Sequence, residues 1–247
     1  MPSSSPTLLD RGLTAIRLTL GLAFLAEGCF ILAFAAQRID AAVAVRLGLY
    51  FLAGIALLSG LFARWAAITL GAYTILSIRL PLPMPDLTLF ELALLCSVSI
   101  GGPGALALGR PLRRTSKPKA ITVARIATGL MALAAGVENI VHGASGLASQ
   151  IAAAGLPAPW AAGFAIVLVE LIAGLALVTG LFTRWAAATL AVEVLLLTAF
   201  LGATKGIDYA VLLLGAAIAL AIAGPGTFAL RGPGRLPVPG GERVETR

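Results

Sequence analysis

Residues 60–70 read GLFARWAAITL, and residues 180–190 read GLFTRWAAATL. The two segments agree at nine of eleven positions. A repeat at a fixed spacing is the sequence signature of a duplicated structural unit. Because the chain around both copies is almost wholly apolar, the repeat predicts a duplicated membrane unit.

Composition places this chain in a lipid bilayer. Of its 247 residues, 59% are hydrophobic and 12% are charged, and the mean hydropathy is +0.99. A helix needs roughly 20 apolar residues to cross a membrane, and strict polar–apolar alternation, the mark of a membrane barrel, is absent. We therefore expect an all-α membrane protein with eight transmembrane helices, near residues 13–36, 41–62, 64–80, 87–107, 121–142, 160–182, 184–202 and 207–223.

The basic residues predict the orientation. The formal net charge is +7, but Lys and Arg lie between apolar stretches and do not form the stripe that would bind a nucleic acid. With the amino terminus inside, fourteen basic residues, Arg17 and Arg125 among them, face the cytoplasm, and only Arg38, Arg46, Arg79 and Lys205 face outward. The positive-inside rule then places both termini in the cytoplasm.

The repeat extends along both halves of the chain. The first and fifth spans align at an offset of 108, the middle spans at 120, and the fourth and eighth at 122, where Gly-Pro-Gly recurs at 102–104 and 224–226. Four helices per unit give parallel repeats related by an axis along the membrane normal. The expected organisation is a cytoplasmic segment at 1–12, a first half at 13–108, a basic cytoplasmic linker at 109–120, a second half at 121–230, and a cytoplasmic tail at 231–247.

The turns around the repeat have structural interpretations. Gly60 and Gly180 are expected to end helices, and the Arg-Trp pairs that follow them anchor the next helices at the membrane boundary. The second half carries a twelve-residue excess between Gly143 and Trp160. Its small residues predict a short helix at the outer surface, ended by Gly155 and Pro157.

Several motifs of the second half resemble one family. They are Arg125 with Gly129, Gly-Leu-Pro-Ala-Pro at 155–159, Glu170 with Ala-Gly at 173–174, the turn at 180–187, and Gly-Pro-Gly at 224–226. Together they resemble the DoxX/DoxD family of four-helix membrane proteins, closely over 121–230 and more loosely over 13–113. The Lys of the family's first helix has no counterpart here, since Asn139 and Ile31 stand near its place.

The resemblance implies association with membrane redox chemistry. The family includes the small subunit of thiosulfate:quinone oxidoreductase and proteins linked to quinone or catechol stress. A DoxX-like chain is thus expected in the bacterial inner membrane, as a possible membrane subunit of a quinone-linked oxidoreductase that works with a cofactor-bearing redox partner and has quinone as its possible ligand.

Five glutamates inside the expected spans need an explanation, because a charge at the centre of a membrane helix costs about 2.5–3.5 kcal/mol. Either each is protonated and hydrogen-bonded to a neighbouring helix, or several share a polar cavity. They are Glu27, Glu91, Glu138, Glu170 and Glu193.

Comparison of the two halves favours a cavity. At the offset of 120, Glu170 corresponds to Tyr50 and Glu193 to Tyr73, so both positions keep a hydrogen-bonding group in both halves. Groups of this kind are expected to face the bundle interior and not lipid. We therefore expect Glu170 and Glu193 to be catalytic and both tyrosines to bind substrate.

A third pair lies near the outer end of the fifth span. Glu138 and His142 are four residues apart, on one face of a helix. Because His titrates near neutral pH, the pair is a candidate for proton exchange with a quinol, and the alternative is an ordinary interfacial histidine. Asn139 and Asp208 are expected to border the same outer vestibule and to bind substrate.

The sequence contains no motif for an intrinsic cofactor or metal. One His, no CxxC pair and no glycine-rich dinucleotide motif argue against haem, an iron–sulfur cluster or a Rossmann-bound flavin. Cys29 and Cys96 either meet across two helices or serve as apolar fillers. The function that remains is a quinone- or redox-associated subunit, with a small-molecule or proton-coupled transporter and a packing scaffold as alternatives.

Overall fold

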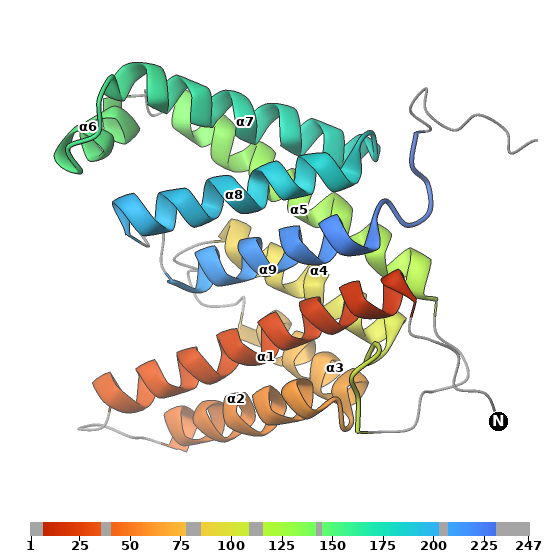
Figure 1. The fold of residues 1–247 in the computed structure, drawn as a ribbon. Coiled ribbons are helices and arrows are strands. Elements are labelled where there is room, and N and C mark those ends of the chain that lie inside the picture. The colour runs from red at the N-terminus through yellow and green to blue at the C-terminus, as the bar shows by residue number, and fades with distance from the viewer. Residues whose placement is uncertain are drawn as a thin grey trace, which may run out of the picture.

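The chain folds into a bundle of helices (Figure 1). The computed structural model describes residues 7–35, 41–77, 85–108, 116–141, 145–202 and 207–230. These residues form nine helices and no strand, which confirms the all-α class. The helices are α1 (Leu8–Ala35), α2 (Ala41–Ser59), α3 (Ala63–Ser77), α4 (Pro85–Gly101), α5 (Lys117–Val141), α6 (Ser145–Ala153), α7 (Pro159–Thr179), α8 (Thr183–Leu201) and α9 (Ile207–Ala223).

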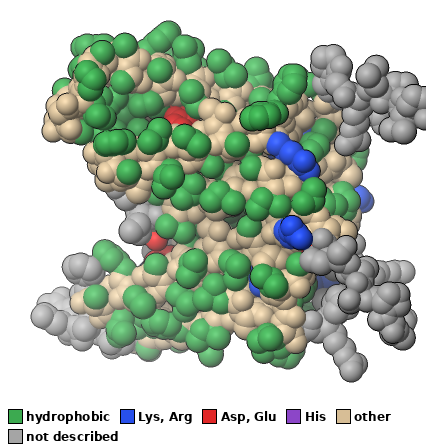
Figure 2. Space-filling view, viewed as in Figure 1, with side chains coloured by type: hydrophobic (Ala, Val, Ile, Leu, Met, Phe, Trp, Pro, Cys, Tyr) green, Lys and Arg blue, Asp and Glu red, His purple; other side chains and the backbone are tan. Residues whose placement is uncertain are grey.

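The helices identify a multi-pass membrane protein. By length and composition, α1, α2, α5, α7 and α8 can each cross a membrane, while the apolar helical stretches Leu87–Gly101 and Asp208–Ala223 are shorter. Many large apolar side chains lie on the surface, including Leu52, Ile172 and Leu195. Figure 2 shows hydrophobic side chains over most of the visible face, with the visible Lys and Arg toward one side and the visible acidic groups toward the other. An apolar exterior of this extent is the surface expected against lipid.

The short helix expected in the second half is present as α6. It ends at Ala153, and Gly155 follows with φ +73° in a tight turn before Pro157. The helix ends expected at the repeated glycines are also present. Gly60, with φ +75°, follows α2, and Gly180, with φ +82°, caps α7, and each donates its backbone N–H to carbonyls of the preceding turn.

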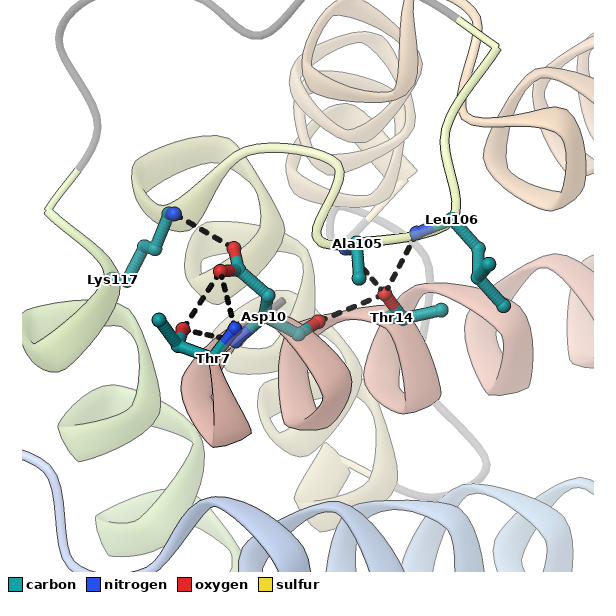
Figure 3. Close-up of polar contacts among 6 residues, drawn as sticks. All are labelled: Thr7, Asp10, Thr14, Ala105, Leu106 and Lys117. Carbon is teal, nitrogen blue, oxygen red and sulfur yellow. Dashed lines mark hydrogen bonds and ion pairs between the residues drawn. The ribbon is translucent and has the colours of Figure 1, made fainter. Parts of the chain in front are cut away.

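The first helix starts earlier than residue 13, where the sequence placed it. Thr7 and Asp10 form a capping box, in which the Asp10 N–H donates to Thr7 Oγ1 and the Thr7 N–H donates to Asp10 Oδ2, each at 3.3 Å. Lys117, at the start of α5, pairs with Asp10 Oδ1 at 2.7 Å (Figure 3). The cap therefore adds residues 8–12 to the helix and ties the starts of the two halves together.

Two reciprocal contacts join the halves. α1 packs against α9, and α5 packs against α4. A Cβ added at Gly12 would lie 2.5 Å from Ala223 Cβ, and one added at Gly101 would lie 2.7 Å from Ala120 Cβ. At the offsets of 108 and 122, Gly12 corresponds to Ala120 and Gly101 to Ala223. The two helix pairs therefore approach each other at equivalent positions, and in both contacts the glycine belongs to the first half and the alanine to the second.

Within each half, paired glycines bring the first two long helices together. A Cβ added at Gly129 of α5 would lie 2.8 Å from the Gly174 carbonyl oxygen of α7, and one added at Gly21 of α1 would lie 3.1 Å from the Gly54 carbonyl oxygen of α2. Small residues permit such close backbone contact between membrane helices. These pairs occupy equivalent positions in the two halves.

A buried arginine closes one end of each half. Arg17 and Arg125 are 0% and 1% exposed, so both side chains lie inside the bundle and not free at its surface. Arg17 Nη2 donates to the Leu106 carbonyl, and Arg125 Nη2 donates to the Phe228 carbonyl at 3.2 Å. Each guanidinium lies against the glycine at the end of α2 or α7, where helix carbonyls and the negative end of the helix dipole favour a cation.

The Gly-Pro-Gly loops complete this arrangement, which we call the arginine latch. In the first half, the Ala105 N–H donates to Thr14 Oγ1 at 2.8 Å (Figure 3), and in the second the Thr227 N–H donates to Thr122 Oγ1 at 2.8 Å. Gly102 ends α4 with φ +79°, so the fourth helix stops at Gly101 and not at 107. Residues 102–108 instead fold back over α1.

Replacing Gly180 with alanine tests the latch. Alanine in a left-handed conformation costs about 1–2 kcal/mol, and its Cβ would overlap the Arg125 guanidinium. We expect the melting temperature of the purified protein to fall by about 2–8 °C, because a loss of about 1 kcal/mol lowers it by about 2–4 °C in a chain of this size. Gly48→Ala is the matched control, because Gly48 lies within α2 and a Cβ there meets nothing within 4 Å. Equal melting temperatures for the two variants would contradict the latch.

Candidate functional site

A cavity of about 270 Å³ lies within the second half. It is lined by α5, α6, α7, α8 and the first turns of α9. Four of the residues expected at the site line it together, namely Glu138, Asn139, Glu170 and Glu193. We call it the second-half cavity. Since these four side chains come from three different helices, the cavity is a product of the bundle and not of one local motif.

Asn139 and Glu170 form the hydrogen bond at its centre. Asn139 Nδ2 donates to Glu170 Oε2 at 2.9 Å, joining α5 to α7. Glu170 is 8% exposed. The Asn139 amide thus supplies the hydrogen-bond donor that a buried carboxylate oxygen of Glu170 needs.

Glu193 differs from Glu170 in its hydrogen bonding. It is 8% exposed, and neither of its buried carboxylate oxygens has a hydrogen-bond partner among the residues that the structure describes. It also lies close enough to Glu170 to interact with it electrostatically. A buried acceptor without a donor costs about 1–3 kcal/mol, so this position is held at an energetic cost.

Only one member of the predicted Glu138 and His142 pair lies among the described residues. Glu138 is exposed at the rim of the second-half cavity, while His142 lies outside the described residues. The proton-exchange role of this pair stays a prediction.

A second cavity, of about 310 Å³, lies within the first half and holds the two tyrosines. The Tyr50 and Tyr73 rings meet edge to face with centroids 6.0 Å apart, and Arg46 Nε donates to the Tyr73 hydroxyl at 2.9 Å. Glu27 and Glu91 also line this first-half cavity. Two glutamates, an arginine and two phenols therefore share one space inside the bundle with a third carboxyl group, that of Asp208.

Asp208 belongs to the first-half cavity and not to the vestibule of Asn139, so that expectation is wrong. The next residue, Tyr209, lines the second-half cavity instead. α9 contacts both α1 and α8, and successive residues on a helix point about 100° apart. Its first turn thus contributes Asp208 to the first-half cavity, and Tyr209 and Ala210 to the second-half cavity.

The two cavities are built from equivalent positions. Ten residues of the first-half cavity have a counterpart at the offsets of 108, 120 or 122 that lines the second-half cavity. The expected pairs Tyr50 with Glu170 and Tyr73 with Glu193 are among them. Glu27 and Glu91, however, correspond to Ala135 and Leu213, so none of these ten pairs carries a carboxylate in both halves. One scaffold therefore encloses two chemically different spaces.

Sequence reasoning missed Arg46 as a member of the first-half cavity. It was assigned to the outer surface because it lies near the start of an apolar span. The available signal was its position four residues before Tyr50, which places both residues on one helical face.

Neither cavity resembles a metal or disulfide centre. Among the described residues, no group of three or more His, Cys, Asp or Glu side chains is arranged to hold a metal ion. Cys29 and Cys96 are exposed and free, so they do not form a disulfide.

A double-mutant cycle measures the bond between Asn139 and Glu170. We expect Asn139→Ala and Glu170→Ala to be less destabilising together than the sum of their separate effects. The coupling should be about 0.6–1.7 kcal/mol, the range for hydrogen bonds between membrane helices. The measurement is the free energy of unfolding in detergent micelles for the four proteins of the cycle. Additive effects would show that the two side chains do not interact.

Comparison with known proteins finds a family match within the second half. The DoxX family model matches residues 120–203, which hold Asn139, Glu170 and Glu193. No curated protein and no solved structure matched the chain. The chain therefore carries a DoxX-like domain over residues 120–203 within an integral membrane protein.

Proposed function

We propose that this protein is the membrane subunit of a quinone-linked oxidoreductase and that the second-half cavity receives the quinol ring. The observation that carries the proposal is Glu193, a buried carboxyl group with no donor among the described residues, beside Glu170 in one cavity. Both groups can accept hydrogen bonds from hydroxyls. A quinol supplies two such hydroxyls on an otherwise apolar ring.

The chemistry of the cavity matches the proton balance of quinol oxidation. Oxidation breaks two O–H bonds and releases two protons and two electrons. In this proposal Glu170 and Glu193, in their ionised forms, take the protons, and the hydrogen bond from Asn139 holds Glu170 in position. The electrons pass to a redox centre on a partner protein, because this sequence contains no recognised motif for a haem, an iron–sulfur cluster or a flavin.

The apolar walls also fit such a ligand. Leu190, Val194 and Leu213 line the cavity between the polar groups. Ligand sites commonly combine mostly apolar walls with a few polar groups that orient the ligand. The first-half cavity holds more ionisable side chains, including Arg46 hydrogen-bonded to Tyr73, and is a less suitable place for the ring.

Isosteric substitution of the carboxyl groups tests this function. Glu170→Gln keeps an acceptor for Asn139 but cannot be ionised, and Glu193→Gln removes the second proton acceptor. We expect each to reduce quinol-dependent electron transfer by the native complex by about 100-fold or more, the usual contribution of a positioned acid or base. Electron transfer is measured spectroscopically on the complex co-purified with its partner.

Thr69→Val is the control for this experiment. Its hydroxyl donates to the Trp65 carbonyl on the exposed surface, away from both cavities, so activity should be kept. Full activity in both glutamine variants would reject the proposed function.

The topology proposed with this function has eight transmembrane helices in two parallel repeats, with both termini in the cytoplasm of a bacterium and the chain in its inner membrane. The excess of basic residues at one set of helix ends and the equivalent latches of the two halves support it. α6 then lies at the outer surface.

Reporter fusions test the topology. Alkaline phosphatase inserted in the 142–144 segment should be active, because it is exported there, and inactive when fused after residue 247. A fluorescent protein that folds only in the cytoplasm should show the reverse pattern. An active phosphatase at the carboxyl terminus would invert the proposed orientation.

One observation favours a transporter as the second candidate function. The acidic groups Glu27, Glu91 and Asp208 line the first-half cavity and interact electrostatically, so both halves contain ionisable groups within the membrane. Counterflow of a labelled solute into sealed vesicles, lost in Glu91→Gln, would support transport over electron transfer.

A further inference from the structure

An apolar groove of about 410 Å³ runs between α6, α7 and α8 on the surface of the second half. We call it the lipid-side groove. Val192, Leu196 and Phe200 of α8 line it and are each at least half exposed. Ile151 of α6 and Leu156 of the following turn form the opposite wall. An apolar surface of this kind can contact an acyl or isoprenoid chain.

The groove and the second-half cavity share a wall. Ile166, Glu193, Leu197 and Leu201 line both spaces. Glu193 therefore lies at the boundary between a polar interior and an apolar, lipid-facing hollow. It is also the carboxyl group whose oxygens have no donor among the described residues.

This arrangement is specific to the second half. Ile151 and Leu156 belong to the segment between α5 and α7 that exceeds its first-half counterpart by twelve residues. Val192 and Leu196 correspond to Ala72 and Leu76 of α3, which are exposed and line neither cavity. The extra segment thus turns one exposed helix face into a groove.

We propose that the lipid-side groove holds the apolar chain of an amphiphile whose hydroxylated ring reaches Glu193, so that the second-half cavity is loaded sideways from the bilayer. The proposal rests on the proposed function, in which that ring is a quinol. Two features fix this occupant. The groove offers only apolar contact along its length, and the group at its inner end is an acceptor that needs a donor. A chain-bearing quinol supplies both in one molecule.

The substitution Leu196→Trp tests the groove by filling it. The protein in lipid nanodiscs is titrated with two quinols that share one ring, of which one carries a decyl chain and the other has no chain. We expect Leu196→Trp to raise the Kd of the decyl quinol by about tenfold or more and to leave the Kd of the chainless quinol within about twofold. Leu76→Trp, the equivalent change in the first half, should alter neither.

A second pair of variants shows whether a loss of binding comes from filling the groove or from misfolding of one variant. Val192→Trp should act as Leu196→Trp does, and its equivalent Ala72→Trp should be silent. Glu193→Gln should weaken binding of both quinols, because both share the ring that it contacts.

The outcomes separate the groove from the proposed function. If the decyl quinol binds Leu196→Trp as tightly as the unsubstituted protein, the groove proposal is wrong while the quinol site survives. If neither quinol binds the unsubstituted protein, both proposals fail. If mass spectrometry shows that Leu196→Trp displaces only a phospholipid and leaves the decyl quinol bound, the groove belongs to the lipid annulus and the proposal is rejected.

Discussion

The architecture depends on enclosing a guanidinium group inside a membrane bundle. Arg17 and Arg125 are buried at one end of each half, each against a glycine that ends a helix and beneath a loop whose carbonyl accepts from it. One loop carbonyl accepts from Nη2 of each arginine and the negative end of a helix dipole favours the charge, while Nε and Nη1 of both arginines have no hydrogen-bond partner among the described residues. The latch thereby fixes three segments that are distant in sequence: the first helix, the end of the second long helix, and the loop after the last.

The latch leaves the other end of each half open to variation. In both halves the cavity lies toward the opposite end of the same helices, lined by the carboxyl-terminal halves of α1 and α5 and the first turns of α4 and α9. Equivalent positions enclose both cavities, but their side chains differ in charge, size and hydrogen bonding. Rigid packing at one end thus supports two different chemical environments at the other.

The sequence predicted much of the scaffold and only part of the site. The helix ends at Gly60 and Gly180 and the short helix α6 could be predicted, because turns and helix ends depend on local residues. The pairing of Tyr50 with Glu170 followed from the repeat, since equivalent positions share a place in the fold. The burial of Arg17 could not be predicted from the sequence, because its hydrogen-bond acceptor lies 89 residues away. An arginine near the start of an apolar span also resembles a residue at the membrane boundary. The separation of Asp208 from Asn139 likewise depends on the rotation of α9, which periodicity does not give.

The reciprocal contacts of Gly12 with Ala223 and Gly101 with Ala120 are those of a twofold pair. In an assembly of two identical four-helix subunits, every substitution would appear in both cavities at once, and a change that improved one would alter the other. Joining the subunits in a single polypeptide removes that coupling. Glu193 and Tyr73 can then occupy equivalent places, and one cavity can gain an extra wall from α6 while its counterpart keeps a shorter connection. Joining both halves in one chain thus lets the side chains of the two cavities diverge while the packing between the halves stays symmetric.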